Sequence, residues 1–231
     1  MTFDLYGFGP ALLAGTWMTI QLALTSLALG LVLGLLGALA KTSPYRILRW
    51  LGDAYSTLVR GVPELLWVLL IYFGSVGLVQ AVGELTGNPE LELSPFAAGV
   101  LALGLCFGAY ATEVFRGALL SIPRGQREAG LALGLSRKRI FLRLVLPQMW
   151  RVALPGLGNL FMILMKDTAL VSVVGLNEVM RNSQIAVTAS KQPFTFYMVA
   201  AIIYLSLTIL SMAALHWMEK RANRGYVRAR A

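Results

Sequence analysis

The chain has 231 residues, of which 57% are hydrophobic and only 13% charged, and its mean hydropathy is +0.69. Soluble domains average roughly 45–50% apolar and 25% charged residues, so this composition excludes an ordinary soluble protein and predicts an all-α integral membrane protein. One cysteine and one histidine leave no disulfide framework and no cysteine or histidine metal cluster, and no cofactor is expected in this chain.

Five long apolar stretches predict the membrane spans, because about 20 helical residues cross the hydrocarbon core. In chain order they cover residues 12–40, 65–83, 93–112, 152–165 and 192–218. The first is too long for the apolar part of a signal peptide. The fourth is too short by itself, so we expect its helix to continue through Lys166 and Asp167 into "TALVSVVGL".

The distribution of Lys and Arg predicts the orientation of these spans, since basic loops stay in the cytoplasm. The connection after the first span carries Lys41, Arg46 and Arg49, whereas the second connection has glutamates and no basic residue. The third connection is the most basic, and the C-terminal tail is also basic. We therefore expect the N-terminus outside, the C-terminus inside, and the third connection in the cytoplasm.

The third connection, "GQREAGLALGLSRKRIFLRLVLPQMWR", predicts two short helices. The first covers 126–133, and Gly134 can end it in a left-handed conformation. Ser136 is placed to cap the second, over 137–144, before Pro147 opens the fourth span. Spacing alone leaves two interpretations open: a basic amphipathic segment resting on acidic lipid headgroups, or a docking surface for a partner.

A wider pattern adds to this reading. Glu128-Ala129-Gly130, Gly134 and then Leu144-x-Leu146-Pro147 resemble the EAA loop of ABC importer permeases, with Gly130 and Leu144 as mild departures. The segments "VRGVPELL", "GAYATEVFRGALLSIPRGQ" and "KDTALVSVVGL" are similar to the polar amino acid uptake subfamily. The stretches "LYGFGPALLAGTWMTIQLALTSLALGLVLGLLGALAK" and "QPFTFY" resemble in particular the permease subunits for histidine, lysine, arginine and ornithine.

The resemblance implies a single permease domain over 1–231, with five spans in the importer fold and a cytoplasmic coupling loop at about 121–147. In relatives this loop sits on a nucleotide-binding subunit. Five residues are carried over as coupling residues: Glu128, Ala129, Gly134, Leu146 and Pro147. The chain has no G-x-x-x-x-G-K-[ST] phosphate loop, so ATP and Mg²⁺ are expected on a partner ATPase.

Charged residues inside the spans have structural and functional interpretations. Arg60 and Glu64, one helical turn apart, predict an ion pair, as do Glu113 and Arg116. Asp167 either pairs locally or lines the substrate path, because a carboxylate inside a span needs compensation. Three neutral polar residues are expected to accompany it in such a path: Asn159, Thr168 and Ser172. A stripe of small residues, Gly30, Gly34 and Gly37, predicts close helix packing.

These expectations describe a permease subunit for import of polar, basic amino acids by alternating access in a bacterial inner membrane. The implied partners are ABC ATPase subunits, a second permease that is a sibling or a copy, a periplasmic binding protein and membrane lipid, with no nucleic acid. The alternatives are a permease for neutral or acidic amino acids such as glutamine or glutamate, and an intramembrane enzyme. The enzyme is disfavoured because H-E-x-x-H and G-x-S-x-G are both missing from the sequence.

Overall fold

The protein is described by a computed structural model that covers residues 5–88 and 92–223. Within these residues five helical segments are long and apolar enough to cross a membrane. They are Gly9–Lys41, Glu64–Thr86, Pro95–Leu120, Arg137–Val174 and Pro193–Ala222. The predicted five spans are thereby confirmed, including the continuation of the fourth through Lys166 and Asp167.

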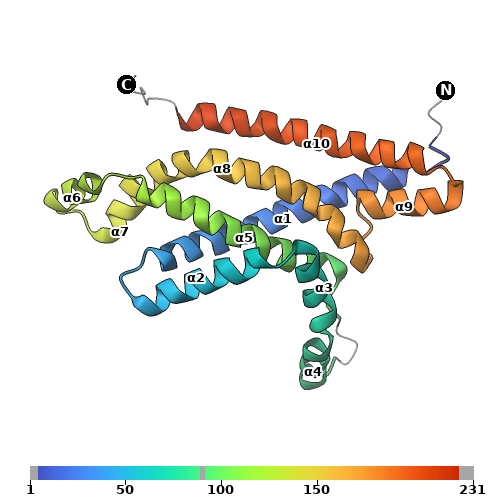
Figure 1. The fold of residues 1–231 in the computed structure, drawn as a ribbon, viewed down its shortest axis with the longest axis horizontal. Coiled ribbons are helices and arrows are strands. Elements are labelled where there is room, and N and C mark those ends of the chain that lie inside the picture. The colour runs from blue at the N-terminus through green and yellow to red at the C-terminus, as the bar shows by residue number, and fades with distance from the viewer. Residues whose placement is uncertain (1–4, 89–91, 224–231) are drawn as a thin grey trace.

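The helices form an elongated bundle (Figure 1). Their bounds are α1 Gly9–Lys41, α2 Arg46–Gly61, α3 Glu64–Gly74, α4 Val76–Thr86, α5 Pro95–Leu120, α6 Arg124–Ala132, α7 Arg137–Ile140, η1 Phe141–Val145, α8 Leu146–Asp167, η2 Thr168–Val174, α9 Val179–Ser190 and α10 Pro193–Ala222. Helices α1, α5 and α8 lie along the middle, with α10 on one side and α2 on the other. Helices α3 and α4 project away from this bundle, and only 6% of their most apolar window is buried.

The bundle is held together at its centre by close packing of α1 against α5. A Cβ built on Gly34 would lie 2.6 Å from the Ala111 Cβ, and one on Gly30 would lie 3.0 Å from the Gly104 carbonyl oxygen. Only bare backbone fits at these two positions, so the helices approach more closely than larger residues would permit. The packing role predicted for the stripe of small residues is confirmed.

Two helices lie in segments for which no span was expected. Helix α2 follows the first span and packs on α1 and α5, while α9 precedes α10 and packs on α1 and α10. Both are too short to be spans, since α2 has 16 residues and α9 has 12, and α2 also contains four charged residues, Arg46, Arg49, Asp53 and Arg60. Their existence depends on burying one face against the bundle, which hydropathy alone does not report.

The second span is interrupted at Ser75, where α3 ends and α4 begins. The Ser75 hydroxyl donates to the Tyr72 carbonyl oxygen at 3.1 Å, and Gly74 and Gly77 flank the break. Glycine–serine pairs are a common cause of sharp changes in helix direction. The expected uninterrupted helix over 65–83 is therefore divided into two.

The expected separate helix over 137–144 is wrong in its end point. Helix α7 passes through the π-helical turn η1 directly into α8, and the whole stretch Arg137–Val174 is continuous. The cause is Pro147, whose ring would clash with the carbonyl of residue 143 in a regular α-helix. The wider π turn just before it relieves this clash without ending the helix.

The two ends of the bundle are distinct. Helices α6 and α7, the C-terminal end of α1 and the C-terminal end of α10 gather at one end, and α9 lies at the other beside the start of α1 (Figure 1). The end that holds α6 and α7 is the one rich in arginine.

Candidate functional site

The loop that joins α5 to α8 has the local geometry expected from its residues. Gly134 is left-handed, with φ +72°, and the Leu135 N–H donates to the Gly130 carbonyl oxygen at 3.0 Å. This closes the end of α6 in the manner of a Schellman turn. The Ser136 hydroxyl then accepts from the Arg139 N–H at 3.4 Å and caps α7. The prediction that Gly134 ends the first helix and that Ser136 caps the second is confirmed.

Helix α6 is attached to the rest of the bundle through Gly130. A Cβ at this position would lie 2.8 Å from Ile140 Cγ1 and 3.1 Å from Leu144 Cδ1. Glycine in place of the alanine usual in the EAA pattern therefore lets α6 cross closely over the α7–η1 segment. The opposite side of α6 is left open, because every other residue of this helix is exposed.

Four of the five predicted coupling residues are exposed on this loop: Glu128, Ala129, Gly134 and Pro147. Leu146 is half-buried and packs against the core. The side chains of Leu131 and Leu133 are 54% and 78% exposed beside them. Exposed leucines between charged side chains form a surface of mixed apolar and polar character, which suits contact with another protein.

A small cavity lies inside the bundle between α3, α5 and α8. Its volume is about 160 Å³, and most of its lining is apolar. Three polar side chains reach it: Glu64 from α3, Tyr110 from α5 and Asp167 from α8. The Tyr110 hydroxyl donates to Glu64 Oε1 at 3.3 Å. Within the described residues neither carboxylate forms an ion pair, so the lining of the cavity has two acids and no basic side chain.

The neutral residues expected beside Asp167 do not line this cavity. The chain becomes a 3₁₀-helix at Thr168, and a 3₁₀-helix advances about 120° per residue, so Thr168 and Ser172 face different directions. Thr168 is buried and donates to the Met165 carbonyl oxygen at 2.7 Å. Asn159 precedes Asp167 by eight residues, about 80° beyond two whole turns, and is exposed. Lys166 is exposed as well and lies outside the lining.

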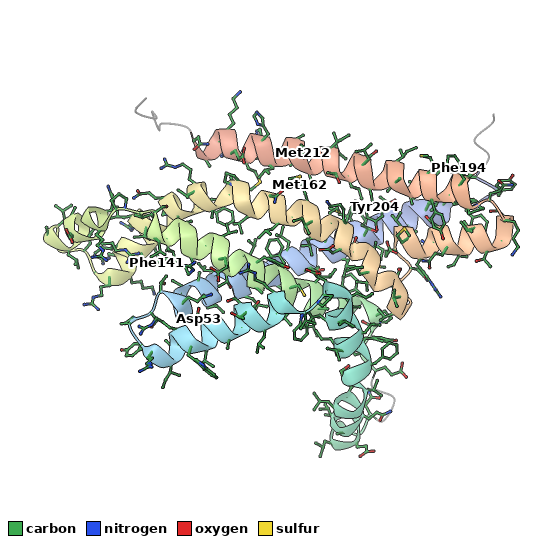
Figure 2. The ribbon with its side chains drawn as sticks, in the orientation of Figure 1. Asp53, Phe141, Met162, Phe194, Tyr204 and Met212 are labelled. Carbon is green, nitrogen blue, oxygen red and sulfur yellow. The ribbon has the colours of Figure 1, made fainter. Side chains whose placement is uncertain are left out.

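An ion cluster joins α1, α2 and α5 one helical turn from the cavity. Lys41 Nζ contacts Glu113 directly and lies 3.0 Å from Asp53 Oδ1, which is labelled on α2 in Figure 2. Arg116 donates to Glu113 Oε2 at 2.9 Å, so the predicted pair between these two residues is confirmed.

The predicted pair between Arg60 and Glu64 does not form. Arg60 instead lies 3.9 Å from Glu113 Oε1, with its guanidinium over the Tyr110 ring. The prediction assumed one continuous helical turn between the two residues. Helix α2 ends at Gly61, and Val62 and Pro63 are extended, so the two side chains leave the backbone in different directions.

A fully buried carboxylate, Glu178, was not singled out from the sequence. It caps α9 by accepting from the Met180 and Arg181 N–H groups, each at 2.8 Å. The Tyr204 hydroxyl donates to Glu178 Oε2 at 2.9 Å, and Tyr204 reaches from α10 toward this site (Figure 2). Burial raises the pKa of Glu178, although these donors oppose the shift. The signal in the sequence is an acid directly before a helix-forming segment, which is a capping pattern.

The five-span bundle, the exposed loop at one end and the polar cavity within define a class of protein: a multi-pass membrane permease. A family model described as "Binding-protein-dependent transport system inner membrane component" matches residues 27–224. The chain belongs to this family, and it is the membrane-spanning component of a transport system rather than the ATPase.

Curated relatives cover nearly the whole chain. Histidine/lysine/arginine/ornithine transport system permease protein HisQ of Escherichia coli (strain K12) is 40% identical over 97% of this chain and 99% of that protein. Arginine ABC transporter permease protein ArtQ of the same strain is 45% identical over 90% of this chain and 92% of that protein. Octopine transport system permease protein OccQ of Rhizobium meliloti is 42% identical over 97% and 95%.

Solved structures share the fold. The crystal structure of an amino acid ABC transporter with histidines aligns with a TM-score of 0.79 and 29% identity, over 96% of this chain and all of that one. An inward-facing structure of the MetNI methionine ABC transporter aligns with a TM-score of 0.73 at 20% identity, which supports the fold alone.

Proposed function

We propose that this chain is a permease subunit of an ATP-driven importer of basic amino acids in the inner membrane of a bacterium, working by alternating access. The substrates are arginine, ornithine, lysine and histidine. The observation that carries this proposal is the pair of carboxylates, Glu64 and Asp167, in one apolar cavity between spans. The names of the similar permeases, two of which include arginine, support the same substrate class.

The physical reason lies in the cost of dehydration. The cationic end of a basic amino acid loses much of its water when it enters a path lined by apolar side chains, at a cost of several kcal/mol. A fixed carboxylate offsets that cost, and a tyrosine hydroxyl beside it adds a hydrogen-bonding group. Every amino acid carries an α-ammonium group that one of the two acids can bind, but only a basic amino acid brings a second cation for the other acid, and an acidic side chain is repelled.

The loop around α6 is the surface through which the energy of ATP hydrolysis enters. We propose that Glu128, Ala129 and Gly134 dock in a groove of a partner ATPase, with Leu146 and Pro147 fixing the angle at which the loop leaves α8. Gly134 supports this role because its left-handed turn presents bare backbone to the partner. The remaining partners are a second permease chain and a periplasmic binding protein, with ATP and Mg²⁺ on the ATPase.

The test of the substrate assignment is Asp167→Asn in the complete complex. Reconstituted in liposomes with its partner subunits and binding protein, this variant is expected to lose about tenfold or more of arginine, lysine and histidine uptake, since one unpaired charge in a dry path costs several kcal/mol. Assembly and the ATPase rate without substrate are expected to stay unchanged. The matched control is Glu84→Gln, which removes an exposed carboxylate from α4 without touching the cavity.

Two results would contradict the assignment. Unchanged uptake of every basic amino acid by Asp167→Asn would show that Asp167 has a structural role and does not bind substrate. Preferential uptake of glutamine or glutamate by the unmodified complex would favour the alternative substrate class.

A further inference from the structure

Arg60 occupies an unusual position between two carboxylates. It lies in the last turn of α2, where the α2–α3 junction passes α5 (Figure 1). Its guanidinium carbon is 5.3 Å from the centroid of the Tyr110 ring, and a guanidinium nitrogen is 3.9 Å from Glu113 Oε1. Within residues 5–88 and 92–223 this guanidinium makes no hydrogen bond, although it carries five N–H donors. Arg60 is therefore held loosely.

The carboxylate of Glu113 has hydrogen-bond partners other than Arg60. Lys41 and Arg116 both donate hydrogen bonds to its carboxylate. The cluster contains three cations, Lys41, Arg60 and Arg116, and two acids, Asp53 and Glu113. Removing Arg60 would leave two charges of each sign, so the cluster gains charge balance by losing it.

Glu64 lies at the hydroxyl of the same tyrosine. Its carboxylate accepts from the Tyr110 hydroxyl at 3.3 Å and lines the cavity together with Asp167. The cavity has the opposite imbalance to the cluster, with two acids and no cation. Tyr110 thus contacts both a loosely held cation, through its ring, and a carboxylate without an ion pair, through its hydroxyl; Arg60 and Glu64 are four positions apart in the chain.

We propose that Arg60 is an internal counter-ion that exchanges between Glu113 and Glu64 and so competes with the cationic end of the substrate. With Arg60 beside Glu113, as in this structure, Glu64 is available to a cation. With Arg60 on Glu64, the acidity of the cavity is halved and a bound basic amino acid is released. This proposal rests on the proposed function of the cavity.

The backbone permits such an exchange. Val62 and Pro63 separate α2 from α3, and a Cβ on Gly61, the last residue of α2, would meet nothing within 4 Å. A change in the tilt of α3 therefore alters the Arg60–Glu64 distance while α2 stays packed on α5. A guanidinium can bind a carboxylate with two parallel N–H donors, an arrangement that the present contact with Glu113 lacks.

The test compares two charge-removing variants that act in opposite directions. Binding of radiolabelled arginine is measured on the purified complex of this chain with its partner subunits, and turnover is measured in liposomes. Arg60→Gln is expected to tighten arginine binding roughly two- to fivefold and to slow turnover, because the competitor is gone. Glu113→Gln is expected to weaken arginine binding by a similar factor, because Arg60 then spends more time on Glu64. Arg60→Lys keeps the charge but loses the planar guanidinium, so its arginine binding should lie between that of the unmodified complex and that of Arg60→Gln.

A purely structural role for Arg60 would shift binding and turnover together and in the same direction for both variants. That result, or unchanged arginine binding by Arg60→Gln, would overturn the proposal. In a chain that already carries Glu64→Gln, adding Arg60→Gln should not change arginine binding further. A further change would also overturn the proposal. If Glu64→Gln and Asp167→Asn each bind arginine normally, the cavity is not the substrate site and the proposed function is contradicted. This result is distinct from those above, which contradict only the role of Arg60.

Discussion

Gly130 and Gly134 perform different tasks at the end of one short helix. Gly130 has ordinary helical geometry and is bare because Ile140 lies against it, whereas Gly134 has open space around it and a left-handed backbone. The second task follows from local sequence, since a glycine after a predicted helix is a typical terminator. The first depends on how α6 crosses α7, which only the folded chain reveals.

Ion pairs also differ in whether local sequence predicts them or helix packing determines them. The pair of Glu113 and Arg116 lies within one helix, so its spacing predicts it correctly. The partner of Arg60 could not be predicted in this way, because it comes from a helix 53 positions further along the chain. Glu64 joins Asp167 for the same reason: the two acids meet only when α3 and α8 pack around α5.

Glu178 leads to a prediction about pH. Burial raises its pKa above the usual value of a glutamate side chain, so the folded protein holds this proton to higher pH than the unfolded chain does. Its contribution to stability is therefore fully present below the unfolded pKa and is lost as the pH rises through the folded pKa. The melting temperature of the wild type minus that of Glu178→Gln should be largest near pH 4 and should shrink as the pH rises, by roughly a few degrees.

The measurement is thermal unfolding of both proteins in the same detergent at a series of pH values. Taking the difference removes titrations that the two chains share. Glu84→Gln, an exposed carboxylate on α4, should give a difference that varies little with pH. A wild-type advantage that grows with pH would show that the donors from Met180, Arg181 and Tyr204 outweigh burial.

At the scale of elements, α6 carries the prediction for coupling. Glu128→Lys reverses a charge on its exposed face, and a bulky residue at Gly134 is strained by a φ of +72°. Both variants should insert into the membrane and yet hold the ATPase subunit less tightly, so that transport and binding-protein-stimulated hydrolysis fall together. Co-purification of the ATPase with the tagged permease measures the first effect, and liposome assays measure the second.

Lys220→Glu serves as the control, since it reverses an exposed charge at the same end of the bundle but on α10. It should retain the ATPase. If the Glu128 and Gly134 variants both transport at the wild-type rate, the loop rests on lipid headgroups and has no docking role.

Elements long and apolar enough to span a membrane were predictable, and amphipathic ones were not. The five spans follow from hydropathy because the bilayer sets their length. Helices α2 and α9 acquire their stability from one buried face, and the break at Ser75 and the π turn η1 reflect local backbone chemistry within otherwise apolar runs. A hydropathy average over about 20 residues does not detect an amphipathic face, a helix break or a single π turn.

At the scale of the whole molecule, the predicted orientation remains to be tested with reporters. A reporter fused after Arg139 should be active only in a cytoplasmic format, because this end of the bundle carries most of the arginines. One fused at Glu90, which lies outside the described residues, should be active only in a periplasmic format. Activity on the reverse side at either position would overturn the predicted topology.

Burial across the whole molecule is uneven in a way that fits a subunit of a larger assembly. The third span is 67% buried in its most apolar window, whereas the second and fifth are 6% and 11% buried. The core therefore centres on α5, and α3, α4 and α10 offer most of their apolar surface to lipid or to other chains. Apolar surface inside a bilayer has no need of a protein partner, so hydropathy alone does not distinguish these two environments.

The π-helical turn before Pro147 has a consequence for how the gene can tolerate insertions and deletions. A π turn contains one residue more than the α-helix it replaces, and each residue of an α-helix turns the chain by about 100°. Losing one codon between Phe141 and Val145 would bring Pro147 against a carbonyl oxygen and would also rotate α6 about the axis of α8 by that angle. The exposed face of α6 would then point sideways. The number of residues between Gly134 and Pro147 is thus constrained as strictly as their identity, even though the residues of that interval face solvent at several positions.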